Sequence, residues 1–184
     1  MKKRLLILSL VAVCLSLCIS GTLAYYTATE RGKNVITAGN IKIELIETDG
    51  EGNPFKDVTG VMPGMEVDKI VNVKNTGDNP CWVRIALNKE IKLRDGLEGT
   101  PDPQLVGLDL DTEYWMEKDG FYYYKKKLPA GEVTGKPLFT KVTFDTAMDN
   151  MYQGSTANII IGVQAVQSAN NGADVLEAKG WPAP

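Results

Sequence analysis

Residues 81–88 read CWVRIALN, and they decide the fold class because their side chains alternate between two faces. One set would project to one side of an extended chain: Cys81, Val83, Ile85 and Leu87. The other set would project to the opposite side: Trp82, Arg84, Ala86 and Asn88. A period of two is typical of a β-strand. The stretch therefore predicts a strand that begins at Cys81.

Similar patterns recur on both sides of this stretch, at 41–45, 67–74, 138–144 and 158–166. The last of these, NIIIGVQAV, is apolar at nearly every position, which favours a central strand covered on both faces. Turn residues lie between the strands, and two aromatic runs flank Asp119-Gly120, which predicts a hairpin with a type I′ turn. Residues 94–111 are loop-like, and 175–179 could form a short helix. Together these patterns predict an all-β fold, an antiparallel sandwich.

The N-terminus has the three parts of a secretory signal peptide. Three positive charges in 1–4 precede an apolar run over 5–19, and small residues at Thr22 and Ala24 predict cleavage between Ala24 and Tyr25. An uncleaved membrane anchor is the alternative, although the run is shorter than the ~20 residues of a membrane span. A lipid anchor at Cys18 is less favoured because Leu17 precedes it. The predicted organisation is a signal-peptide helix over 1–24, an arm over 25–40 and a β domain over 41–184.

Composition narrows the function classes. Cleavage after residue 24 would leave 160 residues and remove three positive charges, so the formal charge would change from −3 to −6, which argues against nucleic-acid binding. The chain has no histidine, so His-dependent nucleophile systems and His zinc sites are excluded. Cys81 would be the single cysteine of the secreted form, either buried or joined to another chain. We expect no enzyme activity and no cofactor.

Two groups of side chains are candidate binding sites. Asp109, Asp111 and Glu113 alternate and would project to one side of an extended segment, as calcium ligands can, or form a solvated acidic loop. Four aromatic side chains could form a surface for polysaccharide, or pack in the core: Trp115, Tyr122, Tyr123 and Tyr124. Lysines at 125–127 follow them and could discourage edge pairing.

The junction GTLAYYT (21–27), with ITAGNIKI (36–43), resembles the start of the TasA and camelysin (CalY) family of secreted Gram-positive proteins. Three further stretches are similar to the same family: VMPGME (61–66) leading to VNVKNTG (71–77), the strand at 81–87, and YQGS (152–155) before 159–165. The resemblance implies a jelly-roll-like sandwich, release by a SipW-type signal peptidase, and fibres of an extracellular biofilm matrix.

The resemblance also implies how subunits join. The mature N-terminal arm, here from Tyr25, Tyr26 and Thr27 to Val35, would add as a strand to the sheet of the next subunit. The expected partners are therefore copies of this chain or a related matrix protein, at the cell surface or in the matrix, with membrane contact only through the signal peptide before cleavage. Two alternatives remain: a monomeric adhesin or carbohydrate-binding module, and, more remotely, a camelysin-like metallopeptidase, an activity that the lack of histidine argues against.

Overall fold

A computed structural model describes residues 34–37, 41–58, 62–96 and 98–182. The described chain is all-β, as the sequence predicts, and its sheets are antiparallel except at one strand pair. Its strands are β1 (Asn34–Thr37), β2 (Ile43–Thr48), β3 (Glu66–Asp68), β4 (Ile70–Asn75), β5 (Cys81–Lys92), β6 (Val106–Leu108), β7 (Trp115–Lys118), β8 (Phe121–Tyr124), β9 (Lys141–Phe144) and β10 (Thr156–Gln167). Two short 3-10 helices, η1 (Pro103–Leu105) and η2 (Asn150–Tyr152), lie between strands.

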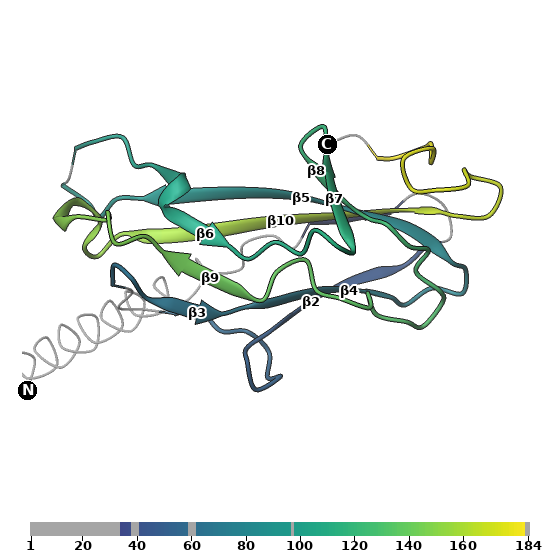
Figure 1. Cartoon of the computed structure of the whole chain (residues 1–184), viewed down its shortest axis with the longest axis horizontal. Coiled ribbons are helices and arrows are strands. Elements are labelled where there is room, and N and C mark those ends of the chain that lie inside the picture. Colours follow the sequence, from purple (N-terminus) through teal and green to yellow (C-terminus); the bar gives the residue numbers. More distant parts are fainter. Residues whose placement is uncertain (1–33, 38–40, 59–61, 97, 183–184) are drawn as a thin grey trace, which may run out of the picture. The chain divides into compact units, whose positions relative to one another are not determined.

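The larger sheet has the strand order β1-β10-β5-β8-β7. Its centre is the long antiparallel pair of β5 and β10, in register from Cys81 opposite Gln167 to Lys92 opposite Thr156 (Figure 1). The strand predicted from CWVRIALN is confirmed and runs four residues further than that stretch. Strand β1 pairs with the other edge of β10 and is parallel to it.

The remaining strands form a second layer. Strand β2 pairs with β4, while β9 lies between β3 and β6. Backbone hydrogen bonds join these two groups, because the segment leading into β9 continues alongside β4: Thr134 N donates to Val73 O at 2.9 Å, and Leu138 N donates to Val71 O at 2.8 Å. Figure 1 shows β2, β4, β3 and β9 facing the long strands β5 and β10.

The main core fills the space between the layers. One face of β5 is buried there, and Val83 and Ile85 are in the same apolar cluster as Val71 of β4 and Val163 of β10. Burying a Val, Leu or Ile side chain contributes about 1.5–3 kcal/mol, so this shared cluster is the main force that holds the layers together. The alternation read from residues 81–88 therefore corresponds to an inner and an outer face.

The predicted hairpin is confirmed. Strands β7 and β8 pair with Lys118 opposite Phe121, so Asp119 and Gly120 form a two-residue turn. Both have positive φ, 52° at Asp119 and 77° at Gly120, as a type I′ turn requires. An aspartate tolerates this region better than most residues, and glycine enters it without steric cost.

Two local expectations need correction. Residues 175–177 form a turn and 178–179 have no regular structure, so the short helix is absent: the Asp174 carboxylate accepts from Leu176 N and Glu177 N, and the Asn171 side chain binds both backbone groups of Lys179. The loop-like stretch 94–111 contains η1 and β6, because Val106 is buried and pulls this stretch onto the core.

The signal-peptide segment 1–24, the cleavage point at Ala24 and Tyr25, and the arm residues 25–33 lie outside the described residues. Within the described ranges, no helix has the length and apolar character needed to cross a membrane.

Candidate assembly edge

The two edges of β10 differ in how much of their length is paired in the described part of the chain. Along one edge β10 pairs with β5 over its full length of 12 residues. Along the other edge it pairs with β1 over 162–165 alone, with Asn34 opposite Gly162 and Val35 opposite Val163. In the chain as far as the structure describes it, no strand pairs with 156–161 on that edge. An unpaired strand edge presents backbone donors and acceptors that can bind another extended chain.

The chemistry of 156–161 fits such binding. The stretch reads TANIII and carries no charge and no proline, two of the devices by which proteins usually protect an exposed edge. Thr156 and Ala157 are exposed, and Ile159 and Ile160 are half-buried. Ile159 packs against the main core, so the two isoleucines contribute to opposite faces of the strand. An added strand would therefore gain apolar contact as well as backbone hydrogen bonds.

The sequence alone does not reveal this edge. The apolar stretch 158–166 favours a strand with strands on both sides, and both edges of β10 are paired from Gly162 to Ala165. Hydrophobicity reports burial of the two faces and says little about which edge is paired. That the described β1 pairs with only four residues of β10 is visible only in the strand pairing.

Two of the three candidate calcium ligands, Asp109 and Asp111, accept hydrogen bonds from different parts of the chain. The Asp109 carboxylate accepts hydrogen bonds from Thr140 N at 2.8 Å, from Lys141 N at 2.6 Å and from the Thr140 hydroxyl. Burial alone would raise the pKa of Asp109, but these bonds outweigh it and lower the pKa below the usual value.

Asp111 instead accepts a 2.7 Å hydrogen bond from Tyr114 N, which caps the turn before β7. Among the residues that the structure describes, no group of three or more His, Cys, Asp or Glu side chains could hold a metal ion. Asp109, Asp111 and Glu113 therefore do not gather into a ligand group in the described part of the chain, which favours the other interpretation, a solvated acidic loop. The period-two spacing assumed an extended segment, whereas residues 112–114 form a turn.

Three of the four candidate aromatic side chains are buried, which favours packing in the protein over a polysaccharide-binding surface. Trp115 is 1% exposed and packs 5.1 Å from the ring of Tyr124, while Tyr123 is buried under the C-terminal segment. Only Tyr122 is half-buried. The aromatic residues pack on both faces of β7 and β8 because successive residues of a strand alternate between faces.

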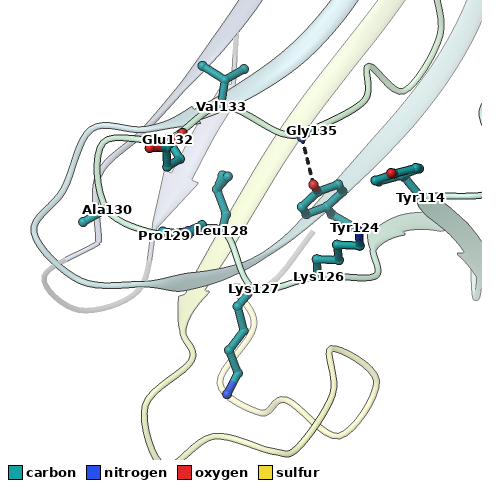
Figure 2. A pocket seen from close by; sticks show the side chains of 10 residues that line it. All are labelled: Tyr114, Tyr124, Lys126, Lys127, Leu128, Pro129, Ala130, Glu132, Val133 and Gly135. Atoms are coloured by element: carbon teal, nitrogen blue, oxygen red, sulfur yellow. Dashed lines mark hydrogen bonds between the residues drawn. The ribbon is translucent and has the colours of Figure 1, made fainter.

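A shallow pocket lies beside this hairpin (Figure 2). Its volume is about 530 Å³. The Tyr124 hydroxyl accepts a 2.8 Å hydrogen bond from Gly135 N at its wall, and the Lys126 ammonium lies 4.4 Å from the centre of the Tyr114 ring. Lys127 points away from the other residues in Figure 2, with its ammonium 5.4 Å from the Trp82 ring. Both lysines are thus engaged with aromatic rings, and the pocket is open and weakly defined.

Comparison with known proteins adds no assignment: no family model matches the chain, and a search of the curated proteins finds no similar sequence.

Proposed function

We propose that this protein is a secreted structural subunit that assembles into extracellular fibres by adding its N-terminal arm to the β10 edge of the next copy. The observation that carries the proposal is the pairing of β10, which is complete along one edge and, among the described residues, limited to 162–165 along the other. The proposed fold of the subunit is a jelly-roll-like sandwich, released by a signal peptidase that cleaves between Ala24 and Tyr25. Its role needs no catalytic residue and no cofactor.

The register of β1 indicates how an arm would sit. Counting back from the Asn34–Gly162 pair, a parallel strand made of residues 28–37 would pair with 156–165. The arm of a neighbouring subunit that replaced the chain's own β1 would therefore cover the open part of β10 as well as the part that β1 covers. The exchange would add backbone hydrogen bonds and cover Ile160. Because the donor and the acceptor are different surfaces, the contact is head-to-tail, and it gives filaments when the rotation between subunits does not close into a ring.

The proposal predicts that removing the arm stops assembly without unfolding the domain. The variant to test lacks residues 25–33 but keeps β1, so the pairing at 162–165 is unchanged. The matched control replaces 25–33 with a Gly/Ser segment of equal length, which keeps the spacing and removes the side chains. Electron microscopy should show filaments for the parent protein and none for either variant, with unchanged circular dichroism. Filaments from the deletion variant would overturn strand addition.

The binding-module alternative has lost its main support, since Trp115, Tyr123 and Tyr124 are buried. The metallopeptidase alternative has no candidate ligand group among the described residues.

A further inference from the structure

The C-terminal segment, residues 168–182, covers part of the outer face of the larger sheet (yellow in Figure 1). Its buried side chains, Val175 and Ala178, form a second apolar cluster with Trp82 of β5 and Val166 of β10. This cluster is separate from the main core, on the opposite face of β5 and β10. The outer face of the sheet therefore carries an apolar surface that the C-terminal segment covers.

Arg84 lies beside this surface, in a row of three side chains that crosses the sheet. Tyr123 of β8 and Gln164 of β10 are its register partners on the two neighbouring strands. Arg84 Nε donates to Gln164 Oε1 at 2.7 Å, and a terminal nitrogen donates to the Tyr123 hydroxyl at 3.2 Å. The guanidinium carbon also lies 3.8 Å from the centre of the Phe121 ring. Side chains of the paired strands β8 and β10 therefore orient this arginine.

The end of the C-terminal segment completes the surroundings of the guanidinium. The Trp181 ring centre lies 4.7 Å from the guanidinium carbon, and Pro182 O accepts a hydrogen bond from its second terminal nitrogen at 3.3 Å. Arg84 is 9% exposed, and within the described ranges no carboxylate forms an ion pair with it. A buried guanidinium of this kind is stabilised by aromatic faces and neutral oxygens, and a cation–π contact is worth ~2 kcal/mol when desolvated.

The C-terminal segment has its own internal bonds. The Asn171 side chain donates to Gln167 O and Lys179 O and accepts from Lys179 N, closing a loop. Few hydrogen bonds connect it to the rest of the described chain: Ser168 N and Oγ donate to Pro80 O, Trp82 Nε1 donates to Asn171 O, and Arg84 donates to Pro182 O. It is thus a loop with its own internal bonds that packs on the sheet through buried side chains, and not a strand of the sheet.

We propose that Arg84, Phe121 and Tyr123 form a docking site for the Trp181-Pro182 end of the C-terminal segment, filled by the chain's own segment and also able to take that of a second copy. The structure shows the occupant seated in the site, so the chemistry of the partner is known. Every copy carries both the site and the segment. Within one chain the local concentration of the segment is high, so exchange becomes important where subunits are crowded. This contact uses the outer face of the sheet and does not depend on strand addition at the β10 edge.

The first test measures docking between separate molecules. The protein is the full chain with Trp181→Ala, which weakens its own segment, and the probe is a fluorescently labelled peptide of residues 168–182. Fluorescence anisotropy should show saturable binding to this variant, and binding at least tenfold weaker to the parent protein, whose site is filled. A protein that carries both Trp181→Ala and Arg84→Gln should bind the peptide at least tenfold more weakly than the Trp181→Ala protein does. A peptide that itself carries Trp181→Ala should also bind the Trp181→Ala protein at least tenfold more weakly than the unchanged peptide does.

The second test asks whether whole chains exchange segments. An Arg84→Gln chain has an intact segment and a damaged site, whereas a Trp181→Ala chain has the reverse. When the two are mixed at high concentration, light scattering should detect a one-to-one complex. At the same concentrations, each variant alone should have the mass of a monomer. Absence of peptide binding, or equal binding with and without Arg84, would overturn the docking site. Peptide binding without a mixed complex would overturn exchange between copies.

Discussion

Arg84 Nε donates a 2.7 Å hydrogen bond to the side-chain oxygen of Gln164, its cross-strand partner on β10. The bond ties a buried charge to the strand that carries the proposed acceptor edge. It also helps to orient the guanidinium, whose carbon lies 3.8 Å from the Phe121 ring centre and 4.7 Å from the Trp181 ring centre.

Replacing Arg84 with lysine should therefore destabilise the domain although the charge is kept. A lysine lacks the planar fork of donors, so Gln164 Oε1 and the Tyr123 hydroxyl would lose partners. We expect the free energy of unfolding to fall by about 1–3 kcal/mol, the cost of buried polar groups left unpaired. Urea denaturation measures it, with the exposed Lys92 changed to Arg as the control that should have no effect. An unchanged midpoint for Arg84→Lys would show that the guanidinium geometry is not important.

Replacing glycine with alanine should have opposite effects at two sites, Gly120 in the β7–β8 turn and Gly162 in β10. Gly120 has φ of 77° and open space around it, so Gly120→Ala adds only backbone strain and should cost about 1 kcal/mol. Gly162 lies in β10 without positive φ, and an added Cβ would meet Ala86 Cβ at 3.7 Å, an ordinary contact. Gly162→Ala should be neutral or stabilising by about 0.4–1 kcal/mol. Chemical denaturation of both variants checks the sign, and a stabilising Gly120→Ala would contradict the type I′ turn.

The Asp109 carboxylate should make stability depend on acid pH. Hydrogen bonds from Thr140 and Lys141 outweigh burial and lower its pKa from the usual 3.8. A group with a lowered pKa in the folded state contributes stability above its unfolded pKa, and that contribution is lost as pH falls through the folded pKa. The unfolding temperature of the parent protein should therefore fall more steeply below pH 4 than that of the Asp109→Asn variant. If the unfolding temperatures of the two proteins change with pH in parallel, Asp109 is not the source of the pH dependence.

Cys81 should be unreactive in the folded protein. It is 0% exposed, and burial raises the pKa of its thiol to about 12, so the reactive thiolate is scarce at neutral pH. Labelling with a thiol reagent should be slow in buffer and fast in denaturant. Rapid labelling of the native protein, or disulfide-linked dimers formed without unfolding, would contradict the burial of this side chain.

The sequence was sufficient for features that depend on neighbouring residues. The alternation of Val83 and Ile85 with Arg84 gave the two faces of β5, and Asp119-Gly120 gave the hairpin. It was insufficient where distant segments meet. The surroundings of Arg84 combine β5, β8, β10 and Pro182, which is 98 residues away along the chain. The alternatives for the aromatic and acidic residues stayed open because adjacency in sequence does not decide whether a side chain faces the core, as Trp115 does, or binds the backbone of another segment, as Asp109 does.

The most direct test of the central claim is negative-stain electron microscopy of residues 25–184 with and without Ile160→Lys, over a range of protein concentrations. Ile160 is half-buried beside the open part of β10, and a lysine there should disfavour pairing at this edge. The control is Asn88→Lys, opposite Ile160 on β5 and one strand away from the edge. We predict filaments from the parent protein and from Asn88→Lys, and none from a folded Ile160→Lys. A parent protein that stays monomeric at every concentration, or filaments from Ile160→Lys equal to those of the parent, would contradict assembly at the β10 edge.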